Sequence, residues 1–186
     1  QASAGLSSSY RIPGLLRVFS SAGPSLVVQS GEEVRGYWVS GGTKVRVSKG
    51  FRFNVEGGKS RGIDYSLLKP ADTHTLEGGA QFRPGQALWL NTSVYQQWFK
   101  TEGEDQERIA RYFAKADWQL SRELGLRAIQ QATEQDGELQ GTSTFLLLTW
   151  LESPGTEAYL GLSWGSDGEE RTPLSAIVKY THLFQL

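Results

Sequence analysis

The 186-residue chain contains no cysteine and no methionine, and it has only two histidines. Without cysteine the protein can form no disulfide, zinc finger, thiolate metal site or catalytic thiol. No apolar run approaches the roughly 18 residues of a membrane-spanning helix, so we expect no membrane span. Hydrophobic residues still make up 38% of the chain, which is too many for a disordered protein.

The length fits a single domain that buries roughly 70% of its unfolded surface and needs no metal to fold. Residues 1–9 carry mostly small and hydroxylated side chains. We expect them to be a flexible N-terminal segment, of the kind that follows a signal-peptide cut or remains from a trimmed arm. Residues 10–186 would then form the domain.

Charge is balanced overall but divided along the chain. Residues 1–100 carry 12 Lys and Arg against 6 Asp and Glu, whereas residues 101–186 carry 7 against 14, which together give the net charge of −1. Such asymmetry is typical of a polyanion-binding surface, or of two surfaces that meet in an oligomer. It also fits a solvated sheet face whose charges are neutralised by the acidic half of the same molecule.

Glycine turns and alternating patterns predict a mainly β protein. Phe51, Phe53 and Val55 alternate with polar residues, as in a half-buried strand. Gly41-Gly42 is predicted to close a hairpin between strands at 34–39 and 44–48. The continuous apolar run at 144–151 indicates a central strand that is buried on both faces.

One amphipathic α-helix is predicted at about 102–124. Thr101 and Glu104 fit a capping box, and the apolar residues from Ile109 to Leu124 form a stripe about 120° wide. Gly125 would end the helix. The predicted fold is therefore an antiparallel β-sandwich or jelly roll of about eight or nine strands, with this helix inserted between strands.

Signatures of catalysis are absent from the sequence. There is no Gly-x-Ser-x-Gly nucleophile elbow and no phosphate-binding Gly-x-x-x-x-Gly-Lys-Ser/Thr loop. His74 lies in an irregular region, and the sequence leaves open whether it has a chemical role. His182 falls at a core-facing position of its predicted strand. We therefore predict no enzyme activity, no metal site and no cofactor.

The first candidate binding surface is basic and lies between residues 35 and 61. Lys and Arg on a sheet beside aromatic rings suit phosphates or other anions, because charge gives affinity and rings give stacking. An ordinary amphipathic sheet is the alternative. The polyanion-binding candidates are Arg35, Lys44, Arg46, Lys49, Arg52, Lys59 and Arg61.

The second candidate surface lies on the predicted helix. Trp118 falls opposite the apolar stripe, in a row with Arg111, Lys115 and Arg122. Trp and Arg are enriched among the residues that dominate binding energy at interfaces. The row therefore predicts a contact surface, although a loop could also cover the indole while an Arg stacks on it.

These features lead to two predicted functions. The first is a non-enzymatic, self-assembling structural protein, such as a capsid or shell subunit, with its basic face towards nucleic acid or another polyanion. The second is a secreted or periplasmic β-sandwich that binds a protein or a glycan. The expected partners are further copies of the chain or another protein. The compartment stays open, with a virion or a secreted or periplasmic location favoured over the reducing cytosol. The layout is compatible with viral jelly-roll coat proteins, and equally with bacterial periplasmic binders and secreted lectin-like modules, because fold alone does not fix function.

Overall fold

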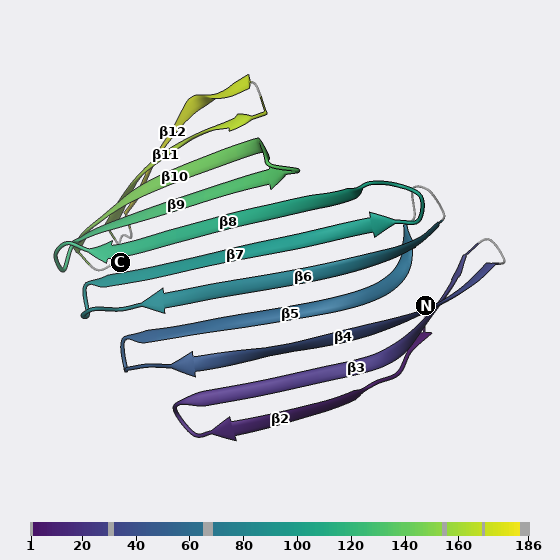
Figure 1. Cartoon of the computed structure of the whole chain (residues 1–186). Coiled ribbons are helices and arrows are strands. Elements are labelled where there is room, and N and C mark those ends of the chain that lie inside the picture. Colours follow the sequence, from purple (N-terminus) through teal and green to yellow (C-terminus); the bar gives the residue numbers. More distant parts are fainter. Residues whose placement is uncertain (1, 30–31, 65–68, 154–155, 169, 183–186) are drawn as a thin grey trace.

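The protein is a single curved sheet of twelve antiparallel strands (Figure 1). A computed structural model describes residues 2–29, 32–64, 69–153, 156–168 and 170–182. Within these ranges the chain forms no helix. The strands are β1 (Ala2–Ser3), β2 (Leu6–Ile12), β3 (Leu16–Gln29), β4 (Glu32–Arg46), β5 (Phe51–Asp64), β6 (Lys69–Phe82), β7 (Leu88–Thr101), β8 (Gln106–Gln119), β9 (Leu124–Gln135), β10 (Glu138–Ser153), β11 (Thr156–Asp167) and β12 (Glu170–His182).

The strand order follows the chain order. Each strand from β3 to β12 is hydrogen-bonded to the next one, and β1 and β2 both pair with β3. Within the described ranges β1 and β2 together form one free edge of the sheet and β12 forms the other. This simple up-and-down order needs only short turns between neighbours.

The predicted β-sandwich or jelly roll was wrong, because the structure has one layer and more strands than expected. Alternating apolar residues were interpreted as facing a second sheet across a buried core. Only Ala71 and Ala110 are buried apolar residues among those described. The alternation therefore marks the two faces of a single sheet, not the inside and outside of a sandwich.

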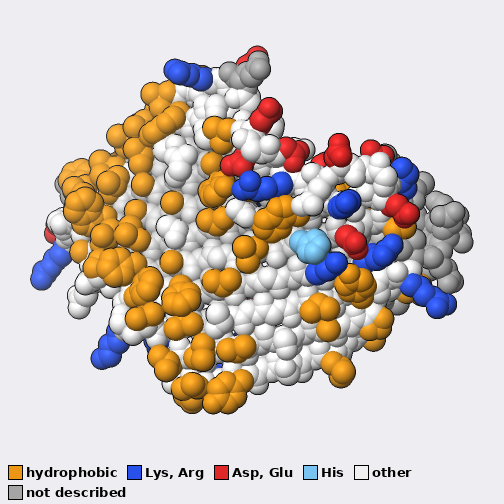
Figure 2. Space-filling model, in the orientation of Figure 1, with side chains coloured by type: hydrophobic (Ala, Val, Ile, Leu, Met, Phe, Trp, Pro, Cys, Tyr) orange, Lys and Arg blue, Asp and Glu red, His pale blue; other side chains and the backbone are white. Residues whose placement is uncertain are grey.

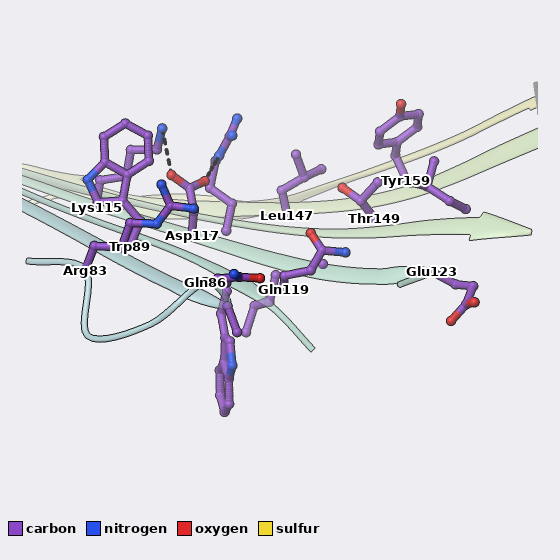
Figure 3. Close-up of a pocket in the computed structure, with 16 residues that line it drawn as sticks. Arg83, Gln86, Trp89, Lys115, Asp117, Gln119, Glu123, Leu147, Thr149 and Tyr159 are labelled. Carbon is purple, nitrogen blue, oxygen red and sulfur yellow. Dashed lines mark hydrogen bonds and ion pairs between the residues drawn. The ribbon is translucent and has the colours of Figure 1, made fainter. Parts of the chain in front are cut away.

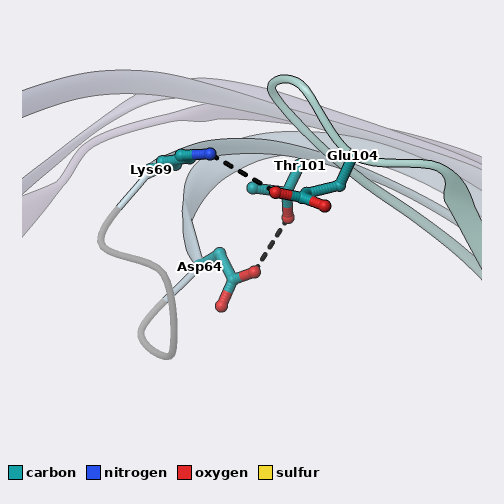
Figure 4. Close-up of polar contacts among 4 residues, drawn as sticks. All are labelled: Asp64, Lys69, Thr101 and Glu104. Atoms are coloured by element: carbon teal, nitrogen blue, oxygen red, sulfur yellow. Dashed lines mark hydrogen bonds and ion pairs between the residues drawn. The ribbon is translucent and has the colours of Figure 1, made fainter.

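The predicted helix at about 102–124 was also wrong, since this segment is a turn followed by strand β8. The capping-box residues make other contacts: Thr101 donates a hydrogen bond of 2.8 Å to Asp64, and Lys69 forms a 3.4 Å ion pair with Glu104 (Figure 4). Gly103 has a φ of 85° at the turn, a conformation that favours glycine.

The hairpin predicted at Gly41-Gly42 does not form, because β4 continues through both glycines. A side chain at Gly42 would have no room: a Cβ there would lie 2.6 Å from the carbonyl oxygen of Val55 and 2.9 Å from the ring of Phe19. Gly42 therefore permits close approach within the sheet and does not close a turn.

The N-terminal residues pair with the sheet where the sequence predicted a flexible segment. Ala2 and Ser3 lie opposite Leu26 and Ser25, and β2 pairs with β3 along its whole length. The division into residues 1–9 and a single domain at 10–186 stays a prediction. In the described part of the chain, no helix is long and apolar enough to cross a membrane.

The close approach at Gly42 predicts a position-specific loss of stability. Gly42→Ala should lower the free energy of unfolding by about 1–3 kcal/mol, because the new methyl group forces the backbone of β5 to shift. Equilibrium unfolding in urea, followed by tryptophan fluorescence, measures the effect. Gly57→Ala is the control, since its Cβ would lie 3.4 Å from its nearest atom, the carbonyl oxygen of Thr75. Equal losses in the two variants would contradict this account.

Candidate functional site

The strand register divides the side chains between two chemically different faces. Residues directly opposite each other on paired strands share a face. Lys44 lies opposite Asn54, and Lys115 lies opposite Asn91. The face that the register assigns to these residues carries mostly charged, amide and hydroxyl side chains. Trp118 lies opposite Leu126 on the other face of the sheet, which carries mostly Leu, Val, Ala and aromatic side chains. We call these the polar face and the apolar face.

Nearly all exposed large hydrophobic side chains on the strands lie on the apolar face. The exceptions are Trp89, Leu151 and Ile177, which lie on the polar face. Figure 2 shows apolar side chains spread across the visible surface of the sheet. A continuous exposed apolar surface of this kind marks contact with a membrane or another apolar partner.

The apolar face carries a row of aromatic side chains near one end of the strands. Phe51 and Phe82 lie opposite each other with ring centroids 6.1 Å apart, and Trp118, Trp150 and Tyr180 continue the row across the sheet. These three exposed side chains are 49%, 45% and 61% accessible. Aromatic rings of this kind favour the boundary between water and a bilayer.

Towards the opposite ends of the strands the apolar face becomes charged. On β8 it is apolar from Trp118 to Ala110 and then reaches Arg108; on β9 it runs from Leu124 to Ala132 and then reaches Glu134. Arg108 and Glu134 form an ion pair of 3.6 Å. We call this charged border the rim; its members are Lys59, Arg61, Asp72, His74, Lys100, Arg108 and Glu134. The apolar band below the rim approaches the ~9–11 residues of a membrane-spanning strand.

The exposed surface is too large for a water-soluble protein of this mass. The accessible area is 13115 Å² for a chain of 20.6 kDa. A folded, soluble monomer of that mass exposes roughly 8,900 Å². Two buried alanines cannot supply a hydrophobic core. The apolar face must therefore be covered by something other than water.

One hollow of about 630 Å³ lies on the polar face, over β7 to β11. Lys115 and Arg127 both contact Asp117, at 3.0 and 2.5 Å, so two cations share one carboxylate (Figure 3). The ammonium of Lys115 also lies 5.9 Å from the centre of the Trp89 ring. Lys115, Arg127 and Asp117 together therefore carry a net charge of +1.

A second hollow of about 500 Å³ lies on the polar face over β2 to β5, and its charge is not neutralised. Five exposed cationic side chains line it. None of the ion pairs formed by the described residues involves any of them. We call this set the basic row; it consists of Arg11, Arg17, Lys44, Arg46 and Arg52.

The predicted polyanion-binding residues are not one surface. Lys44, Arg46 and Arg52 lie together on the polar face, as their cross-strand pairing requires. Arg35, Lys59 and Arg61 point to the apolar face, and Lys49 lies in the turn between β4 and β5. The sequence analysis missed Arg11 and Arg17. Both lie at alternating strand positions that point to the polar face, Arg11 on β2 and Arg17 on β3, and they lie opposite each other.

The predicted interface row is also divided. On a helix, Arg111, Lys115 and Trp118 would lie side by side. On a strand, residues an odd number of positions apart point to opposite faces, so Trp118 is separated from the other two. Arg111 and Lys115 lie on the polar face, Trp118 on the apolar face, and Arg122 in the turn before β9. His74 lies at the rim, opposite Lys59 and Trp98. The described residues contain no group of three His, Cys, Asp or Glu that could hold a metal ion.

Comparison with known proteins identifies the fold. No family model and no curated protein matches the chain. Among solved structures, in-vitro folded OmpT, an outer membrane protein of Vibrio cholerae, matches with a TM-score of 0.60 and 9% identity over 95% of this chain and 61% of that one. Its trimer form matches with a TM-score of 0.58 and 10% identity, over 96% of this chain and 61% of that one. The fold is that of outer-membrane β-barrel proteins.

The chain thus spans less than two thirds of each OmpT structure. The NanC porin is a weaker match, with a TM-score of 0.45 and 7% identity over 98% of this chain and 93% of that one.

This fold overturns the predicted functions. A capsid or shell subunit and a secreted β-sandwich binding module both required a soluble, two-layered domain. The prediction of no membrane span was wrong for the same reason, because proteins of this fold cross a bilayer with strands. A search for long apolar runs finds helices and misses strands that are apolar at every second position. The predicted partners, nucleic acid and further copies in a shell, depended on these functions and were wrong as well.

The two faces predict opposite environments for two neighbouring indoles. Trp89 and Trp118 lie at the same level of the sheet, since Leu88 pairs with Trp118 and Trp89 with Asp117, but on opposite faces. In variants that keep one tryptophan and replace the others with Phe, brominated lipid should quench Trp118 several-fold more than Trp89. Aqueous iodide should show the reverse order. Equal quenching of both indoles by the lipid would contradict the assignment of the faces.

Proposed function

We propose that the protein is a non-enzymatic outer-membrane β-barrel protein that forms a porin-like passage for polar solutes. The observation that carries the proposal is the pairing of an exposed apolar face with a polar, hollowed face on one sheet that has almost no buried core. In a bilayer the apolar face contacts lipid and the polar face lines an aqueous interior. The proposed location is the bacterial outer membrane.

The apolar face has the structure that insertion requires. Its aromatic row, from Phe51 to Tyr180, lies at one end of the apolar band, and the charged rim lies at the other. Gln130 is a polar residue within the band, and Thr144 donates a short hydrogen bond to its side-chain oxygen. The polar group is therefore satisfied inside the protein, which reduces the cost of its contact with lipid.

The proposal also requires that the sheet be closed. Unpaired backbone groups at the edges of β2 and β12 would each cost several kcal/mol in hydrocarbon. These edges must pair with each other or with further strands, because an open edge is not stable within a bilayer. Closure would place the polar face on the inside, where the hollows already lie.

Insertion predicts opposite effects of charge at adjacent residues of β10. Leu148 lies on the apolar face and Leu147 on the polar face. Leu148→Arg should destabilise the inserted protein by about 2–4 kcal/mol, because the guanidinium would face lipid. Leu147→Arg, the matched control, should cost clearly less, at most about 1 kcal/mol, because its charge faces the polar side, where it lies opposite Arg127. The fraction of protein protected from protease in vesicles measures both. A larger loss for Leu147→Arg would reverse the assigned faces and contradict insertion.

Transport is tested directly by conductance across a planar bilayer. The inserted protein should give discrete current steps in potassium chloride, because the polar face provides a water-filled path. Vesicles that contain it should also swell when placed in a solution of a small sugar. Protein that is protected in the bilayer but gives neither current nor swelling would contradict the proposed passage, while leaving the membrane location intact.

A further inference from the structure

We propose that the basic row forms a binding site for the oxyanions of passing solutes, carboxylates or phosphates, and that it makes the passage anion-selective. This inference rests on the proposed function and names the class of solute that the passage favours. It also retains part of the polyanion prediction from sequence, namely Lys44, Arg46 and Arg52, and adds Arg11 and Arg17 from the neighbouring strands.

The register brings like charges directly together. Arg11 lies opposite Arg17, Arg17 opposite Lys44, and Arg46 opposite Arg52. Opposed residues in antiparallel strands have Cβ atoms about 4.5–5.5 Å apart, and like charges at that separation destabilise the sheet. A row of such pairs costs stability that an anion would restore.

The contacts of the row leave its charge available. Arg17 and Lys44 both lie over the ring of Phe19, at 5.7 and 5.8 Å from its centre. A cation over a ring keeps its charge, unlike one paired with a carboxylate. The nearest carboxylates further along β5 and β6, Glu56 and Glu77, form no ion pair with the row.

The other hollow of the polar face provides the contrast within the same molecule. There Asp117 forms ion pairs with both Lys115 and Arg127, so this cluster has a net charge of +1. The five cations over β2 to β5 form no ion pair with any described residue. The basic row therefore carries more unpaired positive charge than the Asp117 cluster.

The chemistry of the row fits oxyanions. Arg offers planar, paired N–H donors that match a carboxylate or a phosphate, and four of the five cations are Arg. Asn54 and Gln81 line the same hollow and can hydrogen-bond other polar groups of a solute. All five cations are exposed, so an anion is attracted without being held too firmly to leave, as conduction requires.

Ion selectivity tests the proposal. In a planar bilayer with a potassium chloride gradient, the reversal potential of the wild type should indicate preference for chloride. Arg17→Glu combined with Arg52→Glu should lower the ratio of anion to cation permeability by on the order of tenfold, since the net charge of the five-residue basic row falls from +5 to +1. The neutral double variant, Arg17→Gln with Arg52→Gln, should give an intermediate permeability ratio. It replaces the charge-reversed variant in the test if that variant inserts poorly.

The matched control makes the same charge change outside the passage. Lys59 and Arg61 lie on β5 with Arg52, but at the rim of the apolar face. Lys59→Glu with Arg61→Glu should leave the reversal potential unchanged. An open channel whose selectivity is the same in the Arg17 and Arg52 variants as in the wild type would overturn the inference, while the proposed passage would stand.

Binding measured without current separates this inference from the proposed function. Detergent-folded protein should bind inorganic phosphate or acetate at low ionic strength, measured by titration calorimetry, because exposed charges are weakly screened there. The probe that binds with the higher affinity shows whether the site favours phosphate or carboxylate. Binding that is lost in Arg17→Glu with Arg52→Glu and kept in the control would support the site even if the protein conducts no current. No binding of either probe to the wild type would overturn it.

Discussion

The structure depends on one continuous ladder of backbone hydrogen bonds between antiparallel neighbours. Most proteins of this length are held together by a packed core, but here only two alanines are buried apolar residues among those described. The ladder joins β3 to β12 without interruption, and the register that it sets decides which face every side chain occupies. A slip by one residue would exchange the apolar and polar faces along a whole strand.

The ladder also explains how charges far apart in sequence come together. Arg11 lies on β2 and Arg46 on β4, with the whole of β3 between them in the sequence, yet both line the hollow over β2 to β5. The same rule unites Lys115, Asp117 and Arg127 over β8 and β9. The first hollow holds a carboxylate that pairs with two of its cations, whereas the basic row has no such partner among the described residues, so the polar face has a defined electrostatic pattern instead of a uniform polarity.

The sequence alone predicted that the protein is rich in β structure, and it predicted part of the basic row. Phe51, Phe53 and Val55 alternate with polar residues as expected and do share a face, and Lys44 with Arg46 was correctly placed on one wet surface. The residue types could not show what the apolar surface faces, because a strand that contacts lipid and one that contacts a core have the same period of two.

The false helix had a specific physical origin. Alanine is common in helices, and the residues from Ile109 to Leu124 fall on one helical stripe. The same segment has apolar side chains at every even position from Ala110 to Trp118, which is the pattern of a strand. Ile109 and Phe113, on the polar face, completed the misleading stripe. Only the neighbouring strands decide between the two periods, and they lie elsewhere in the sequence.

The short connections between the strands have a consequence for sieving. No connection between consecutive strands from β2 to β12 is longer than residues 83–87, so none of them could fold back as a plug across the interior. In the proposed passage these connections leave discrimination by molecular size to the width of the sheet and to side chains such as Trp89 and Tyr159, which line the hollow over β7 to β11. In that passage the charge of the wall would sort solutes more finely than its width does.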